Sequence, residues 1–158
     1  MSKQKVVILA YGEGGHKKEM SLLFQHLIDS NLTFISLGPS ALHQGVEHYT
    51  LGDVRHKQNR IKSIGMAMYG AMKAIVTTLK VCRQYRVSGI ISTGPGIAIL
   101  PSLLLRLQGK KVVFIETFCR FYTRSFTGKL MSKLSNEFWV QNKEQLRLYK
   151  NARYCGRL

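Results

Sequence analysis

Two glycine-rich turns constrain the fold of this 158-residue chain more than any other feature. The first runs from Gly12 to His16, and the second runs from Thr93 to Gly96. Each turn follows a short apolar run that predicts a buried strand, and each precedes a helical pattern. In an open α/β sheet such turns lie at the carboxyl ends of the strands, where ligands bind. Because glycine lets the backbone approach a ligand closely, the two turns predict a binding site at that edge.

The rest of the chain alternates apolar runs with helical patterns. We predict strands over residues 6–11, 32–37, 49–51, 89–93, 111–116, 138–141 and 152–155. We predict helices over residues 15–30, 60–86, 97–108, 127–134 and 143–150. Apolar strands that alternate with helices indicate a parallel sheet covered on both faces. We therefore expect one Rossmann-like α/β domain over residues 1–158, with strand order 3-2-1-4-5-6, which places the two glycine turns side by side.

The charge of the chain predicts an anionic partner. Lys and Arg total 24 against 8 Asp and Glu, so the formal net charge is +16. No acidic residue occurs between Asp53 and Glu116. Such a balance suits nucleic acid, anionic lipid headgroups or a phosphate-bearing substrate. Nucleic acid is the weakest of the three, because the basic residues are scattered and form no recognised nucleic-acid-binding motif.

The cysteines and the apolar runs indicate the cellular compartment of the chain and its relation to a membrane. Cys82, Cys119 and Cys155 are odd in number and lack C-x-x-C spacing, which favours a reducing cytoplasm over a disulfide framework or a zinc site. The uncharged run over residues 87–105 contains prolines and glycines, so it predicts strand, turn and helix. We therefore expect no transmembrane helix and no bound metal.

The first glycine turn departs from the nucleotide-binding fingerprints. A dinucleotide-binding turn reads G-x-G-x-x-G, and Lys17 stands where the third glycine belongs. The second predicted strand is followed by Gly38, Pro39 and Ser40, without the acidic residue that would hold a ribose hydroxyl. No G-x-x-x-x-G-K-[ST] loop occurs either. The sequence therefore disfavours NAD and P-loop chemistry, and we expect no cofactor.

His16 and Glu116 are the candidate catalytic residues. The helix N-terminus at His16 disfavours imidazolium, which would leave a neutral imidazole able to accept a proton. His16 is then either a general base toward a hydroxyl or a helix-start residue with local hydrogen bonds. Glu116 ends the fifth predicted strand and a long basic region. It either orients a substrate hydroxyl or pairs with Arg120 in a structural ion pair.

Two further segments have alternative interpretations. Arg120 and Arg124 alternate with aromatic residues, which suits a surface that meets phosphates at an apolar–polar boundary. The alternative is a solvated loop whose aromatic side chains fold into the core. The methionine-rich helix predicted over residues 60–86 either belongs to the core or lies on a membrane or a partner.

Several segments together resemble a known family. The turn at residues 12–16 (GEGGH) resembles the first glycine loop of GT-B glycosyltransferases that act on polyprenyl-linked acceptors. The chain is similar to the PssD/CpsF-like subunits of bacterial capsule and exopolysaccharide synthesis. It is also similar to the membrane-recruiting subunit of the two-part UDP-GlcNAc transferase of dolichol-linked oligosaccharide synthesis. The matching segments are residues 91–98 (ISTGPGIA), 109–120 (GKKVVFIETFCR), 127–130 (TGKL), 138–141 (FWVQ) and 156–158 (GRL).

The resemblance implies the N-terminal half of a GT-B enzyme whose two halves are separate polypeptides. This chain would bind a polyprenyl-diphosphate-linked acceptor at an anionic membrane surface, while a separate subunit holds the UDP-sugar. His16 would match the proposed base of an inverting, metal-independent transfer, and Glu116 would orient the acceptor or His16. The residues that would contact the acceptor or its diphosphate are Gly14, Gly15, Thr93, Gly94, Gly96 and Arg120.

We therefore expect a cytoplasmic protein, peripheral at the inner face of the cell membrane, that acts in capsule or exopolysaccharide synthesis. We expect no binding of nucleic acid. A non-catalytic scaffold that activates a partner carrying all the chemistry is the main alternative. A basic nucleic-acid-binding protein is a weaker one.

Overall fold

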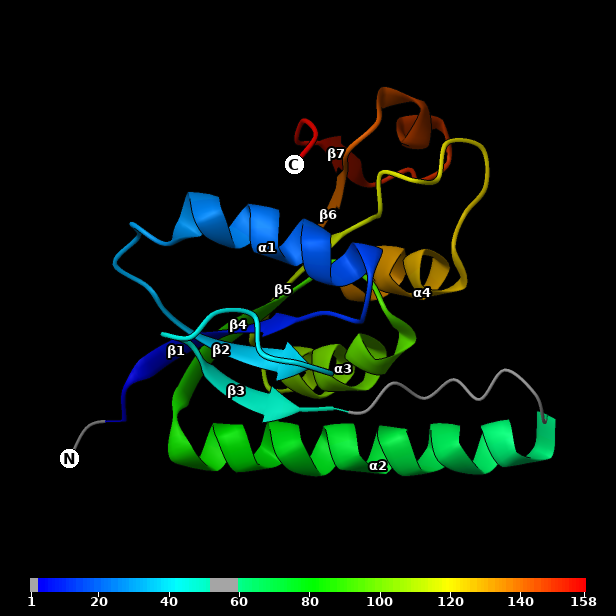
Figure 1. The fold of residues 1–158 in the computed structure, drawn as a ribbon. Helices are drawn as coiled ribbons and strands as arrows, with labels where there is room; N and C mark the ends of the chain where they lie inside the picture. The colour runs from blue at the N-terminus through cyan, green and yellow to red at the C-terminus, as the bar shows by residue number, and fades with distance from the viewer. Residues whose placement is uncertain (1–2, 52–59) are drawn as a thin grey trace.

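One seven-stranded parallel sheet forms the centre of the molecule. The structure is a computed structural model that describes residues 3–51 and 60–158, except for the side chains of residues 60–64, 66 and 67. The strand order is β3-β2-β1-β4-β5-β6-β7, and all six pairings are parallel (Figure 1). This confirms the predicted order 3-2-1-4-5-6 and adds β7 at the edge beside β6.

The strands agree with the apolar runs of the sequence to within three residues. β4 begins at Arg86 rather than at residue 89, because Arg86 pairs with Lys5 and its amide donates to the carbonyl of Gln4. The strands of the described chain are β1 (Lys5–Ala10), β2 (Thr33–Gly38), β3 (Glu47–Thr50), β4 (Arg86–Ser92), β5 (Lys111–Ile115), β6 (Glu137–Val140) and β7 (Ala152–Tyr154).

The helices confirm the helical patterns with one exception. The described helices are α1 (Gly15–Leu27), α2 (Arg60–Gln84), α3 (Ile99–Leu107) and α4 (Phe126–Leu134), with 3₁₀ helices η1 (Gly96–Ala98) and η2 (Lys143–Arg147). The helix predicted over residues 143–150 is wrong, because only the short η2 forms there. Gln145 is fully buried, and its amide oxygen accepts from the amides of Gln141 and Asn142, which closes a tight turn instead.

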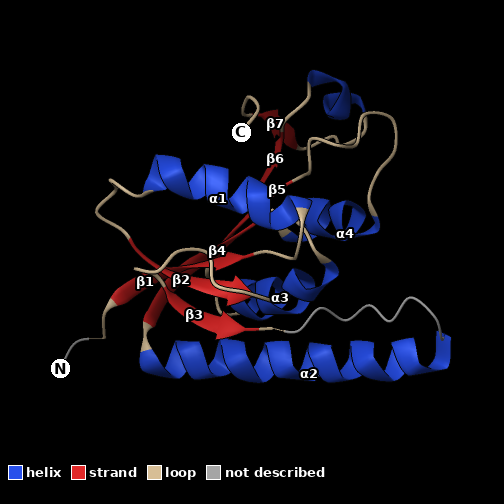
Figure 2. Cartoon of the chain, in the orientation of Figure 1, coloured by secondary structure: helices blue, strands red, loops and turns tan. Residues whose placement is uncertain are grey.

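The helices cover the two faces of the sheet unequally. α1 packs on one side, and α2 and α3 pack on the other (Figure 2). Along β1 the side chains alternate: Ile8 and Ala10 join the core beneath α2, α3 and α4, while Leu9 and Tyr11 join the core beneath α1. Both faces of the central strands are therefore buried, which explains their continuously apolar sequence.

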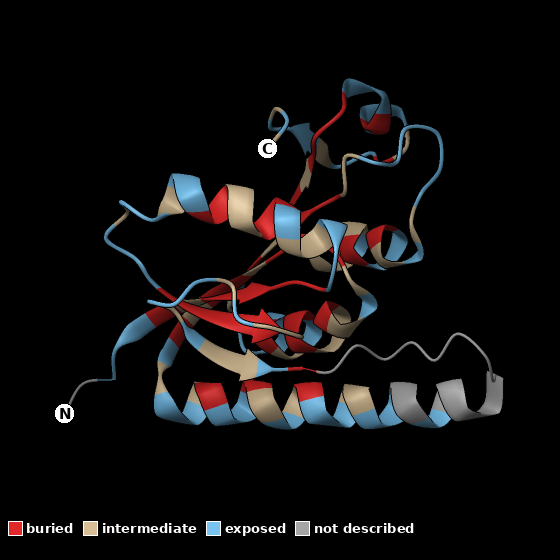
Figure 3. Ribbon diagram, in the orientation of Figure 1, coloured by how far each residue is buried: buried red, intermediate tan, exposed pale blue. Residues whose placement is uncertain are grey.

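One face of α2 confirms the core interpretation of the methionine-rich helix, and its contact with a membrane or a partner stays a prediction. Its inner face buries Ala74, Thr78 and Val81. Its outer face is exposed along most of its described length (Figure 3) and carries apolar side chains at helical spacing: Met68, Tyr69, Met72, Val76 and Leu79. We call these five residues the outer stripe. Within the described chain, α2 included, no helix combines the length and the hydropathy needed to cross a bilayer.

Candidate functional site

The two glycine turns meet at the carboxyl ends of the neighbouring strands β1 and β4, as predicted. Two hydrogen bonds between His16 and Thr93 join the turns. The Thr93 hydroxyl donates to the carbonyl oxygen of His16 at 2.9 Å, and the His16 Nδ1–H donates to the carbonyl oxygen of Thr93 at 2.7 Å. This reciprocal pair sets the position of the imidazole at the edge of the sheet.

The hydrogen bond to Thr93 also selects the form of the His16 ring. A carbonyl oxygen only accepts, so Nδ1 carries the proton, and Nε2 is the accepting nitrogen of the neutral ring. The side chain is 35% exposed. The ring packs directly on Gly94, whose φ is 130° and where a β-carbon would overlap the imidazole. Only glycine fits at this position.

Glu19 is a site residue that the sequence reasoning did not identify. It lies one helical turn beyond His16 on α1 and is 1% exposed. Its Oε2 lies 3.8 Å from the Nδ1 of His16. Its Oε1 accepts hydrogen bonds from the Thr117 hydroxyl at 2.8 Å and the Phe118 amide at 3.1 Å. The His-x-x-Glu spacing was the available signal, because residues three apart share one face of a helix.

The two acidic residues reverse the predicted protonation tendency of His16. The pKa of His16 is raised above its ordinary value, chiefly by its contact with the Glu19 carboxylate. Burial acts in the opposite direction, whereas the Thr93 carbonyl and the charge of Glu116 add to the rise. The helix N-terminus was expected to disfavour imidazolium, but the net shift of the His16 pKa is upward, because the Glu19 carboxylate and the Thr93 carbonyl favour the protonated ring more than burial disfavours it.

Glu116 is buried, and its carboxylate accepts hydrogen bonds from three groups. The Tyr149 hydroxyl donates to its Oε2 at 2.7 Å, the Ser125 hydroxyl donates to the same oxygen at 2.9 Å, and the Thr117 amide donates to Oε1. Arg120 donates instead to Thr123, so the described structure contains no ion pair between Glu116 and Arg120. Burial of Tyr149 raises the pKa of its hydroxyl, and the hydrogen bond to the Glu116 carboxylate raises it further. The Tyr149 hydroxyl therefore stays protonated and remains a donor.

The remaining predicted residues fall into two groups. The buried Thr93 and the glycine after it shape the environment of His16, as described above. A β-carbon at Gly14, Gly15 or Gly96 would meet no atom within 4 Å, so the backbone there borders open space. Arg120 lies exposed on the loop after β5. Contact of these residues with an acceptor or a diphosphate stays a prediction.

The described residues provide no group of three or more His, Cys, Asp or Glu side chains able to hold a metal ion. At the carboxyl edge of the sheet the structure places an imidazole whose Nδ1 is held by Thr93, two buried carboxylates, and glycine backbone that borders open space. An imidazole whose Nε2 is free to accept is suited to removing a proton from a hydroxyl.

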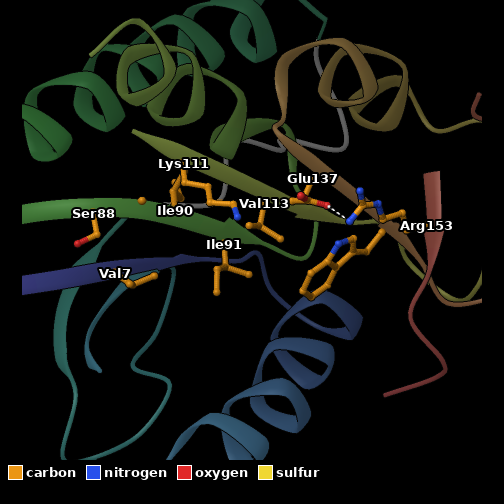
Figure 4. Close-up of a pocket in the computed structure, with 10 residues that line it drawn as sticks. Val7, Ser88, Ile90, Ile91, Lys111, Val113, Glu137 and Arg153 are labelled. Carbon is orange, nitrogen blue, oxygen red and sulfur yellow. Dashed lines mark ion pairs between the residues drawn. The ribbon is translucent and has the colours of Figure 1, made fainter. Parts of the chain in front are cut away.

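A separate hollow of about 400 Å³ lies on the α1 side of the sheet, away from the glycine turns (Figure 4). Its floor includes the half-buried side chains of Ile91, Val113 and Trp139, from β4, β5 and β6. An ion pair of 3.3 Å between Glu137 and Arg153 lies beside them. Of the described helices, α1 alone contributes to the core on this side, and the side chains of Ile91, Val113 and Trp139 stay partly exposed there.

Comparison with known proteins assigns the family. Residues 6–158 match the family model described as "Oligosaccharide biosynthesis protein Alg14 like". The chain belongs to the Alg14-like family. It is 28% identical to "UDP-N-acetylglucosamine transferase subunit ALG14" of Kluyveromyces lactis, over 98% of this chain and 78% of that protein. It is 33% identical to the human protein of the same name, over 44% of this chain and 35% of the human chain.

Solved structures with this fold are longer than the present chain. The MurG of Acinetobacter baumannii superposes with a TM-score of 0.64 at 14% identity, over 98% of this chain and 44% of its own. The UDP-GlcNAc 2-epimerase of Methanocaldococcus jannaschii superposes with a TM-score of 0.66 at 13% identity, over 98% and 47%. The chain thus spans less than half the length of either structure, and at these identities the likeness concerns the fold alone.

Proposed function

We propose that this chain is the acceptor-binding and membrane-recruiting subunit of a two-part glycosyltransferase. The complex transfers a sugar from a UDP-sugar, with UDP-GlcNAc the donor named for its relatives, to a polyprenyl-diphosphate-linked saccharide. The segments that resemble capsule and exopolysaccharide subunits favour a role in the synthesis of such polymers. The family supports the two-part transferase, and the site supports the acceptor role.

The observation that carries the proposal is the position and hydrogen bonding of the His16 imidazole at the carboxyl edge of the sheet. Its imidazole stands between the two glycine turns, with Nδ1 held by Thr93 and with no hydrogen bond to Nε2 from the described residues. In the proposed reaction Nε2 removes the proton of the acceptor hydroxyl while the oxygen attacks the anomeric carbon of the sugar. The backbone amides near Gly14 and Gly15, at the N-terminus of α1, and the guanidinium of Arg120 would face the diphosphate.

The open sheet face supports a partner subunit. The hollow over β4, β5 and β6 exposes apolar side chains that a sheet normally covers with a helix. We assign this face to the subunit that holds the UDP-sugar. The arrangement leaves the carboxyl edge of the sheet, with His16, free to face that subunit's donor site.

The outer stripe of α2 supports recruitment to a membrane. It gathers five exposed apolar side chains on one helix face, with Lys73 and Lys80 exposed on the same helix. An apolar face flanked by basic residues favours an anionic lipid surface, where the side chains enter the headgroup region. This membrane contact would be peripheral and at the cytoplasmic side.

The test is a transfer assay with the complex. The chain is co-purified with a UDP-sugar-binding subunit from its own cell, and transfer to a polyprenyl-diphosphate-linked saccharide is measured. His16→Gln should lower kcat by about a hundredfold or more, the usual contribution of a general base. His26→Gln, an exposed histidine on the same helix, is the matched control and should leave the rate unchanged.

The outcomes separate the alternatives. If the wild-type complex transfers no sugar, the proposed transferase function fails. If the His16→Gln complex transfers at the wild-type rate, the chain acts as a scaffold and the partner carries all the chemistry.

A further inference from the structure

We infer that Glu19 is the positioning residue for His16: its buried carboxylate faces the imidazole and ties the loop after β5 to it. This inference rests on the proposed role of His16 as the base. It concerns a residue outside the glycine turns, and it follows from contacts between α1 and a loop about a hundred residues further along the chain.

Burial makes the carboxylate of Glu19 unusual. A carboxylate that is 1% exposed needs partners, because taking an unpaired charge out of water is costly. Its Oε1 has two donors, the Thr117 hydroxyl and the Phe118 amide. Its Oε2 is buried and has no hydrogen-bond partner in the described part of the chain. The titratable group that this oxygen faces is the imidazole of His16, whose Nδ1 lies 3.8 Å away.

The reaction supplies the charge that Glu19 lacks. The proton of the acceptor hydroxyl passes to Nε2 of His16, and the electron pair of the hydroxyl oxygen forms the new bond to the anomeric carbon. The bond from that carbon to the phosphate oxygen breaks, and UDP leaves with its electron pair. His16 is then an imidazolium beside Oε2 of Glu19. The carboxylate stabilises this cation without taking its proton, because Nδ1–H stays bonded to Thr93.

Glu116, the carboxylate singled out from the sequence, is less suited to this role. Its oxygens accept from Tyr149, Ser125 and the Thr117 amide, so its charge is already engaged. Two acidic side chains act on His16, Glu19 from α1 and Glu116 from the end of β5, and both favour imidazolium. Glu19 has the stronger effect and faces the ring directly.

The other carboxylate oxygen of Glu19, Oε1, holds the loop after β5. By accepting from Thr117 and Phe118, it fixes the start of the loop that carries Arg120. An acceptor bound by that loop would therefore keep a fixed position relative to the imidazole of His16. One side chain thus positions the base and the surface on which the hydroxyl would be presented.

The test is the titration of His16 by NMR in the isolated chain, labelled at histidine. The His16→Gln variant assigns the resonance. Glu19→Gln keeps the size of the side chain and removes its charge, so the pKa of His16 should fall below its wild-type value. Thr117→Ala keeps the carboxylate and removes one loop contact, so it is the matched control and should leave that pKa nearly unchanged.

The same variants distinguish positioning from a general structural defect in the transfer assay. In Glu19→Gln the acid limb of the kcat/KM profile should move to lower pH, because the weaker base loses its proton earlier. Its kcat should fall about tenfold or more. Thr117→Ala should keep the wild-type acid limb and change KM more than kcat.

An unchanged His16 pKa in folded Glu19→Gln overturns the inference, whatever the transfer assay gives. If Glu19→Gln does not fold, Glu19→Asp retains the charge and draws it back by one methylene, so a His16 pKa equal to wild type would overturn it. The titration needs neither partner nor donor. A complex without transfer activity therefore contradicts the proposed function and leaves the relation between Glu19 and His16 to be decided by the titration.

Discussion

Gly94 shows how one backbone position determines the placement of a reactive side chain. Its φ of 130° lies in the region that favours glycine, and the His16 ring occupies the space where a β-carbon would project. The glycines of the second turn were expected to approach a ligand. In the structure Gly94 approaches the imidazole, while Gly96 borders open space.

Gly94→Ala should therefore displace the His16 ring and strain the turn. We expect a loss of about 1–3 kcal/mol in the free energy of unfolding, the usual cost of a sparsely populated backbone conformation. Urea denaturation measures it, and transfer by the complex should fall with it. Gly96→Ala is the matched control and should change stability by less than about 0.5 kcal/mol. A Gly94→Ala chain as stable and active as wild type would contradict this placement of the ring.

At the scale of the elements, Glu116 joins three segments that are separate in the sequence. It directly follows β5, and its carboxylate accepts from Ser125, the N-cap of α4, and from Tyr149, which lies just after η2. The Ser125 hydroxyl also accepts from the Gly128 amide at 2.7 Å. One buried carboxylate thus stabilises the start of α4 and the return of the chain toward β7.

Tyr149→Phe should weaken this junction without changing its shape. Removing one donor to a buried carboxylate costs about 1–3 kcal/mol. Chemical denaturation should show a lower midpoint, and hydrogen exchange should show faster exchange in α4. Tyr154→Phe is the control, because Tyr154 is exposed on β7 and should leave the midpoint unchanged. Equal midpoints for both variants would mean that Tyr149 contributes packing only.

The elements were largely predictable from the sequence, and the contacts between them were not. Periodicity and glycine turns are local, so the strands, four helices and the adjacency of the two turns followed from them. The Gln145 turn depends on a buried amide that bonds Gln141 and Asn142, so periodicity alone predicted a longer helix there. Pairing Glu116 with Arg120 used proximity in sequence, whereas its partner Tyr149 is 33 residues away. The spacing of Glu19 from His16 is local, but its buried contacts to Thr117 and Phe118 join residues about a hundred positions apart, so the sequence did not single it out.

For the whole molecule, the excess of positive charge and the outer stripe of α2 suggest a single mode of attachment. The net charge of +16 draws the chain toward an anionic surface, but charge alone is screened by salt. The five apolar side chains of the outer stripe can enter the headgroup region and add a contribution that salt does not screen. The two contributions together predict peripheral binding that is weakened by salt and not abolished.

Binding to vesicles tests the two contributions separately. Met72→Gln with Val76→Gln removes apolar surface at constant charge, and burial of each such side chain contributes about 1.5 kcal/mol or more. Partition onto vesicles of anionic lipid should fall about tenfold or more at every salt concentration. Leu107→Gln changes a still more exposed apolar residue, on α3, and should leave partition unchanged. Lys73→Gln with Lys80→Gln should instead reduce the salt dependence.

If the Met72 and Val76 variant binds like wild type, the outer stripe meets a protein rather than a membrane. If the wild-type chain binds vesicles equally in low and high salt, electrostatic attraction does not contribute to membrane binding.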